Sequence, residues 1–550
     1  MDVASASARP GPTHGESARP GGAARLARSA GVIGLATMSS RLLGLVRDQV
    51  LAYVFAASHD MDAYLVAFRI PNLLRDLFAE GAMSAAFVPT FTRLLTLEGK
   101  PAAWRLGNLV VNALLLVTGT LVLVGIAFAS PIARFAAPRY AEVPGQLALV
   151  VTLARLMFPF LTLVALAAAC MGMLNSLRRF FVPSLSPAMF NVGMIATMGV
   201  MIPLLSARGV RPIFAAAIGT LVGGIGQVAV QWALLRREGY RYRPAVAFGD
   251  PAVREVIGLM VPGMVGLAAV QVNVLVNTML ATGQGVGAVS YLNYAFRLMY
   301  FPIGLFGLSI ATAAVPALSR HAALDDRAAM RATLSSALRM MLMLNVPATV
   351  GLVVLATPIV ALIFEHGHFT PRDTAGTVAA LLAYAPGLVG YSAVKITVPT
   401  FYTLRDSRTP VLVSGVTVGL NLALNLVLVR WLGYQGLALG TAIAALVNAA
   451  VLLWLLRARL DGIDGRRLAV ALLKILAASA AMAAAVWSVE GWLARTVPGP
   501  ALMPRAVHVA ASIGVGVGVL ATTARALRIS EFQEAVRTVA ARLRGSRTNS

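Results

Sequence analysis

Long apolar runs dominate this chain and constrain its fold. Stretches of about 20 residues or more, closed by Arg, Gly or Pro clusters, recur about fourteen times, and this is the length at which an α-helix crosses a bilayer. Only 12% of the 550 residues are charged, which excludes a soluble protein of this size. We therefore expect an all-α, polytopic membrane protein with spans near 30–55, 61–95, 106–135, 147–175, 183–206, 212–236, 254–281, 289–319, 331–364, 375–404, 409–431, 435–457, 467–489 and 503–525.

The basic residues behind the net charge of +24 are distributed unevenly between the two sides of the membrane, so this charge does not indicate nucleic acid as a partner. Fourteen spans place both termini on one side, which carries about 29 Lys and Arg residues against about 8 on the other. The positive-inside rule makes the richer side cytoplasmic. We expect both termini to be cytoplasmic, with a disordered tail at 1–29 that lacks the apolar core of a signal peptide, and a second tail at 527–550.

An internal repeat divides the spans. Pro89 and Arg93 correspond to Pro316 and Arg320 at an offset of 227, and the segment SLRRFFVP corresponds to TLRDSRTP at the same offset. This register predicts two parallel six-helix lobes, 30–237 and 254–457, with two further helices at 466–526 outside the repeat. Two such lobes suit a transporter that rocks about a central site, whereas a duplicated scaffold without transport leaves the buried charges unexplained.

Arginines within the expected spans are the main functional signal. Each charge at the centre of a bilayer costs about 2.5–3.5 kcal/mol, so a group of them indicates a water-filled, cationic cavity. A guanidinium stays charged when it is desolvated and binds two phosphate oxygens at once, which favours a phosphate-like ligand. Fixed ion pairs are the alternative. The candidate ligand-binding residues are Arg41, Arg47, Arg75 and Arg297.

Other charged residues are assigned supporting or gating roles. Asp62, Arg69 and Asp76 recur every seven residues, so they share a helix face, and an ion-pair ladder is expected there. Asp48 and Glu80 are expected to position the arginines or to latch two conformations together. Lys395 is a lone cation in its span, and cavity lining and snorkelling to the interface remain equally open for it.

The chain offers little else of chemical interest. His366 and His368 have no further ligands near them in sequence, so neither a metal nor any other cofactor is predicted. Cys170 is the only cysteine and lies in an apolar run, where a structural thiol is expected. No phosphate loop, nucleotide motif or catalytic triad appears, which argues against an enzyme.

The sequence resembles the MurJ/MviN family of lipid II flippases, within the superfamily of multidrug, oligosaccharide-lipid and polysaccharide exporters. The likeness is sharpest in SSRLLGLVRD, in DAYLVAFRIPNLLRDLFAEGAMSAAFVPTF and in YAFRLMYFPIGLFGLSIATAAVPALSR. The resemblance implies fourteen helices, location in the inner membrane, and transport of undecaprenyl-diphosphate-linked disaccharide pentapeptide to the periplasmic leaflet for peptidoglycan synthesis. It also matches the family's cavity arginines to Arg41, Arg47, Arg75 and Arg297, and a family aspartate to Asp62.

Two other functions remain open. One is export of a different polysaccharide lipid or of a drug, although a carrier of cationic drugs would place acids and not arginines in its cavity. The other is a scaffold without transport activity in the cell-wall synthesis complex, whose division and synthesis proteins are possible partners in either case.

Overall fold

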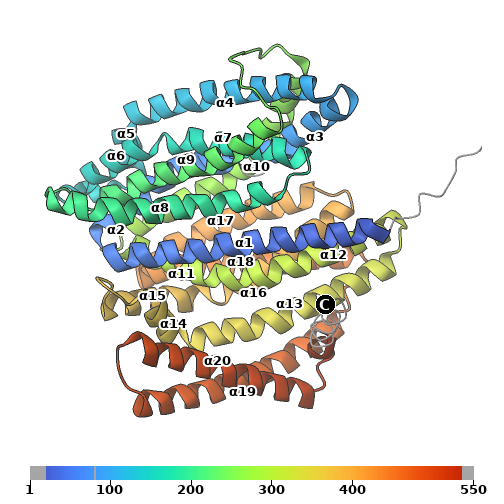
Figure 1. Cartoon of the computed structure of the whole chain (residues 1–550). Coiled ribbons are helices and arrows are strands. Elements are labelled where there is room, and N and C mark those ends of the chain that lie inside the picture. The colour runs from blue at the N-terminus through green and yellow to red at the C-terminus, as the bar shows by residue number, and fades with distance from the viewer. Residues whose placement is uncertain (1–19, 80–81, 535–550) are drawn as a thin grey trace, which may run out of the picture.

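The computed structural model describes residues 20–79 and 82–534, and these residues form helices and connecting loops without any strand (Figure 1). The helices run side by side in one bundle. Their bounds are α1 (Pro20–Phe55), α2 (His59–Ala79), α3 (Ala82–Leu97), α4 (Lys100–Ala127), α5 (Ala129–Ala136), η1 (Pro138–Glu142), α6 (Gln146–Met157), α7 (Phe160–Ser176), α8 (Phe181–Ala207), α9 (Ile213–Arg237), α10 (Pro251–Thr282), α11 (Ala288–Pro302), η2 (Ile303–Gly307), α12 (Leu308–Ala323), α13 (Arg327–Val354), α14 (Ala356–Phe364), α15 (Pro371–Tyr384), α16 (Gly387–Thr403), α17 (Arg408–Leu432), α18 (Tyr434–Arg459), α19 (Gly465–Thr496) and α20 (Leu502–Ala526).

Each of the fourteen expected spans coincides with one helix or with consecutive helices in the described residues. Within the described residues, nine helices are long and apolar enough to cross a membrane, and the bent pair α15 and α16 makes a tenth. The other four expected spans are α1, α2 with α3, α10, and α11 with η2 and α12. Three of these four carry the arginines singled out in the sequence, which explains their lower hydropathy. The prediction of an all-α, polytopic membrane protein is confirmed.

The helix interruptions recur at the offset found in the sequence. At three places, residues 227 positions apart interrupt or end equivalent helices in the same way. The junction of α4 and α5 corresponds to that of α13 and α14, and a proline separates α6 from α7 as another separates α15 from α16. A residue with φ of 59° follows both α7 and α16. The pairs are Phe128 with Leu355, Pro159 with Pro386, and Arg178 with Arg405. The shared register therefore extends from sequence to backbone geometry.

Small residues bring helices together within two groups. Helices α1–α9, called the N-lobe below, pack mainly on one another, and α8 meets α9 so closely that a Cβ on Gly193 would lie 2.9 Å from the Cα of Gly223. Helices α10–α18, called the C-lobe, contain a similar approach, in which a Cβ on Gly390 would lie 2.6 Å from the carbonyl carbon of Ala445. Such contacts replace the hydrophobic driving force that is absent between helices in lipid.

Two ends of the bundle serve as landmarks. Helices α1 and α19 begin at one end, called proximal below, and α1 joins α2 at the other, called distal (Figure 1). Helix α10 belongs to the C-lobe in sequence, but it also packs against α2 and α3 of the N-lobe. The hairpin of α19 and α20 lies along the outside of the C-lobe and packs mainly against α13 (Figure 1).

Candidate functional site

Asp48 on α1 is the centre of a charge cluster between the lobes. Its Oδ1 accepts hydrogen bonds from Nε and Nη2 of Arg47 at 3.1 and 2.7 Å, and its Oδ2 lies 3.3 Å from Nε of Arg297 on α11. The Asp48 side chain is only 6% exposed, whereas that of Arg297 is 50% exposed. A buried carboxylate thus joins two arginines from opposite lobes, and one of them keeps an exposed guanidinium.

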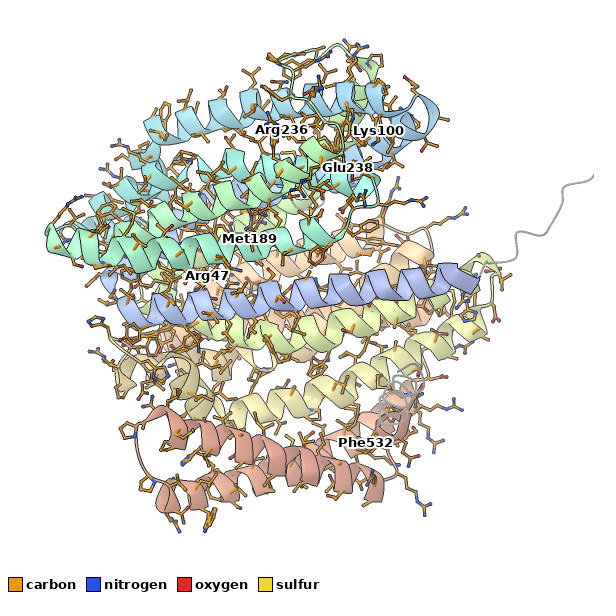
Figure 2. All side chains as sticks on the ribbon, viewed as in Figure 1. Arg47, Lys100, Met189, Arg236, Glu238 and Phe532 are labelled. Carbon is orange, nitrogen blue, oxygen red and sulfur yellow. The ribbon has the colours of Figure 1, made fainter. Side chains whose placement is uncertain are left out.

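Arg47 is held on all sides by its own lobe. Besides its bonds to Asp48, its Nη1 donates to Oδ1 of Asn191 on α8 at 3.1 Å, and its guanidinium lies over the ring of Phe190, 5.8 Å from the centroid. Figure 2 shows Arg47 on the side of α1 that faces α8. Asn191 also donates to the carbonyl of Ser40, which ties α8 to α1. The three nitrogens of Arg47 therefore all have partners.

Arg41 reaches across to the C-lobe without an ion pair. A Cβ on Gly304, in the π-helical turn η2, would lie only 2.0 Å from Nη1 of Arg41, so the guanidinium packs directly on the backbone of that turn. No acidic partner for Arg41 occurs within the described residues. The absence of a side chain at Gly304 therefore makes room for the guanidinium of Arg41.

Arg75 and Asp76 form a second pair farther along α2. Nε and Nη2 of Arg75 donate to Oδ1 of Asp76 at 2.8 and 2.6 Å, and Nε2 of Gln271 on α10 donates to the other oxygen at 3.1 Å. Both charged side chains are about one quarter exposed or less. This pair also bridges the lobes, since α10 follows the connection between them.

The ion-pair ladder expected along α2 is not formed. Among the described residues, neither Asp62 nor Asp76 lies within ion-pair distance of Arg69, because the two carboxylates are engaged by other helices. Sharing a helix face was necessary for the ladder but was not sufficient. Arg69 itself is half-buried, and its role as a supporting residue stays a prediction.

Asp62 instead caps a helix of the opposite lobe. Its Oδ2 accepts from the backbone N–H of Gly287 at 2.7 Å, and its Oδ1 accepts from the N–H and the hydroxyl of Ser290 at 2.9 and 2.6 Å. These groups form the start of α11, where a carboxylate satisfies unpaired N–H groups and complements the helix dipole. Asp62 is 1% exposed, so these hydrogen bonds are shielded from water.

Three further hydrogen bonds join the lobes near the same end. Nε2 of Gln49 donates to the carbonyl of Ile363, the N–H of His368 donates to the carbonyl of Tyr53, and the hydroxyl of Tyr294 donates to the carbonyl of Ala56. Together with the bonds of Asp62, we call this set the distal latch. Backbone carbonyls are the acceptors of these three further bonds, so among the residues of the latch only Asp62 gave a signal in the sequence.

The two remaining predicted residues are less informative. Lys395 on α16 is exposed and has no ion pair within the described part of the chain, so both of its predicted roles remain open. Glu80 lies outside the described residues. No group of three His, Cys, Asp or Glu side chains that could hold a metal ion occurs among residues 20–79 and 82–534.

Comparison with known proteins identifies the family. A family model described as lipid II flippase MurJ matches residues 51–503, which is most of the chain. The chain belongs to the MurJ family. A probable lipid II flippase MurJ of Vibrio cholerae is 34% identical over 442 residues, covering 78% of this chain and 82% of the relative. The lipid II flippase MurJ of Burkholderia cenocepacia is 36% identical over 429 residues, covering 77% and 82%.

Solved structures agree with this membership. A lipid II flippase MurJ in an inward closed conformation superposes with a TM-score of 0.73 at 25% identity, covering 90% of this chain and 99% of that structure. An inward-facing multidrug transporter of the MATE family superposes with a TM-score of 0.67 over 79% of this chain and 98% of that structure, and at 15% identity it shows only a common fold. As a MurJ family member, the chain is a multi-pass membrane transporter and not an enzyme.

Proposed function

We propose that this chain flips lipid II, the undecaprenyl-diphosphate-linked precursor of peptidoglycan, from the cytoplasmic to the periplasmic leaflet of the inner membrane by alternating access. Membership of the MurJ family supports the substrate, and the arginines between the lobes support the mode of binding. The observation that carries the proposal is Arg297, whose half-exposed side chain lies between the lobes with its Nε 3.3 Å from the carboxylate of Asp48.

The four arginines contribute unequally to the proposed diphosphate site. Arg297 has its two terminal nitrogens available, and Arg41 has no carboxylate partner within the described residues. Arg47 is already bonded through three nitrogens, and Arg75 is paired with Asp76. Arg41 and Arg297 are therefore the first contacts for a diphosphate, while Arg47 mainly sets the charge and position of Asp48. The planar fork of a guanidinium donates two parallel hydrogen bonds, which suits a pair of oxygens on one phosphate group.

The position of the distal latch supports alternating access. In the described part of the chain, the hydrogen bonds found between α1–α9 and α11–α18 involve residues 49–62 on one side and 287–368 on the other. Helix α10, which packs against the N-lobe, is bonded to it separately, through Arg93 and Asp76. If the termini are cytoplasmic, as the charge distribution predicts, the distal end is periplasmic and the latch keeps this conformation closed to the periplasm. A lipid headgroup then enters from the cytoplasmic side, and the latch opens to release it on the other.

Lipid II export in cells depleted of their own flippase tests the proposal. In cells lacking any other lipid II flippase, this chain should restore labelling of lipid II at the outer leaflet. The Arg297→Ala variant should fail at normal expression, and Arg297→Lys should rescue poorly because an ammonium cannot form a fork. Arg430→Ala is the matched control, since Arg430 is exposed on α17 and forms no described ion pair. Failure of the unaltered chain refutes the function, while full activity of Arg297→Ala refutes only the site.

A further inference from the structure

A basic pocket lies outside the two lobes, at the proximal end of the α19–α20 hairpin. It has a volume of about 390 Å³ and is formed by α13, by the first turns of α19 and by the segment that follows α20. Five cationic side chains face a single carboxylate there. They are Arg339, Arg466, Arg467, Lys474 and Arg528, and the carboxylate is Glu531.

The single carboxylate is already neutralised. Nη1 of Arg339 is hydrogen bonded to Oε1 of Glu531, and Glu531 is buried. Ile529 is buried beside it in the apolar core of the C-lobe, and Phe532 packs against the same core at the proximal end of the hairpin (Figure 2). These contacts fix the segment after α20 in place, so the wall of the pocket is built by tertiary packing and not by a free tail.

The other four cations lack comparable partners. Arg467 lies 4.0 Å from Asp464 in the same exposed turn, a contact of little energetic weight. Arg466, Lys474 and Arg528 have no ion pair within the described residues. Four positive side chains around one pocket give it a positive potential that attracts an anion.

The depth of the charges indicates an amphiphilic anion. Arg467 and Lys474 are seven residues apart on one face of α19, and Lys474 lies nine residues, about 14 Å, from the start of the helix. Val470, between them, is exposed and apolar, as is Leu473 on the adjacent face. A ligand that reaches Lys474 from the water therefore passes apolar surface, which suits a headgroup with acyl chains.

We propose that this pocket binds the phosphate of an anionic phospholipid in the leaflet at the proximal end. Basic pockets between transmembrane helices on the cytoplasmic side bind such headgroups, and the predicted topology places the proximal end there. The site is separate from the arginines between the lobes and does not depend on transport. It gives the α19–α20 hairpin, which lies outside the internal repeat, a binding function of its own.

Lipid binding to the purified full chain tests this site. Native mass spectrometry in detergent would compare phosphatidylglycerol, phosphatidylcholine with the same acyl chains, and inorganic pyrophosphate. The doubly substituted chain, Lys474→Gln with Arg528→Gln, leaves the Arg339–Glu531 bond intact, so the segment after α20 stays docked. Each basic side chain near an anionic lipid contributes about a fivefold change in affinity, so loss of two should raise the dissociation constant for phosphatidylglycerol about thirtyfold.

A control of equal charge distinguishes the pocket from general basicity. Arg236→Gln with Arg237→Gln removes two exposed charges from the proximal end of α9, and this chain should bind phosphatidylglycerol as the unaltered one does. Equal weakening by both double substitutions, or none by the first, would overturn the proposal. Equal affinity for phosphatidylcholine would show that the headgroup charge is not recognised. Tight binding of pyrophosphate without preference for the lipid would assign the pocket to a soluble phosphate instead.

Discussion

Asparagine at position 62 should open the distal latch while leaving the fold intact. In Asp62→Asn the side chain keeps its shape and its Oδ1, which continues to accept from Ser290. The second oxygen becomes an NH2 group that faces the N–H of Gly287, so one hydrogen bond is replaced by two opposed donors. The negative charge at the start of α11 is lost as well.

The size of the effect follows from these contacts. A hydrogen bond to a charged group contributes about 1.5–3 kcal/mol, and a charge at a buried helix terminus contributes up to about 2 kcal/mol. Because Asp62 is 1% exposed, water does not replace the lost acceptor in the closed conformation. We expect a loss of about 2–4 kcal/mol from the closed conformation relative to the open one, which raises the open-to-closed ratio about 30- to 700-fold.

A single cysteine reports the opening. Ala57 is buried against Gly287, since a Cβ on that glycine would lie 2.8 Å from the carbonyl oxygen of Ala57. In Ala57→Cys, a membrane-impermeant thiol reagent reacts only when the latch opens, and Cys170 is buried and stays unreactive. The initial rate of labelling should rise by the factor given above when Asp62→Asn is added.

A neighbouring acid supplies the control. Asp60 is bonded to Arg211 at 3.3 Å, and both residues belong to the N-lobe, so Asp60→Asn removes the same charge two residues away without breaking a bond between lobes. Its labelling rate should stay close to that of the unaltered chain. Equal rates for Asp62→Asn and Asp60→Asn would show that Asp62 does not hold the lobes together, and the reasoning would then be wrong.

Two further substitutions test the supports of the site. Arg505→Ala removes hydrogen bonds at 2.6 and 2.7 Å to the side chain and carbonyl of Glu365. We expect the free energy of unfolding to fall by about 2–4 kcal/mol in thermal unfolding, and hydrogen exchange over 363–370 to become faster when measured by mass spectrometry. Unchanged exchange would contradict this. Gly304→Ala places a methyl group where the guanidinium of Arg41 lies, so lipid II export should fall at least tenfold with normal expression, and full export would contradict a role for the Arg41 position.

The sequence predicted the elements well because membrane spans follow from length and hydropathy alone. The offset of 227 between Pro89 and Pro316 is also the register at which helices are interrupted in the structure, although the interruptions themselves were not predicted. The π-helical turn η2 was not expected, since nothing local in Ile303–Gly307 marks it apart from Pro302 and two glycines. Its shape depends on packing against Arg41 and Ser392, which are distant in sequence.

The sequence indicated which residues belong to the candidate site better than it indicated which of them pair with one another. Intramembrane charge singled out Arg47, Asp48 and Arg297, and the structure joins these three. Helical periodicity wrongly paired Arg69 with Asp62, because it describes one helix and takes no account of the backbone N–H groups at the start of another. The partners that sequence reasoning missed, such as Asn191, are ordinary polar residues whose role arises only from the way α8 lies against α1.

The ion pair between Asp48 and Arg297 affects the electrical work of the proposed transport cycle. When no substrate is bound, the carboxylate cancels one of the two guanidinium charges next to it, so in the proposed alternating-access cycle the site moves one charge fewer through the membrane field. Each charge that crosses fully is worth about 2.3 kcal/mol per 100 mV. An inside-negative potential assists the inward return of a basic site, so a permanent internal counter-ion of this kind reduces the share of the membrane potential that the proposed return step can use.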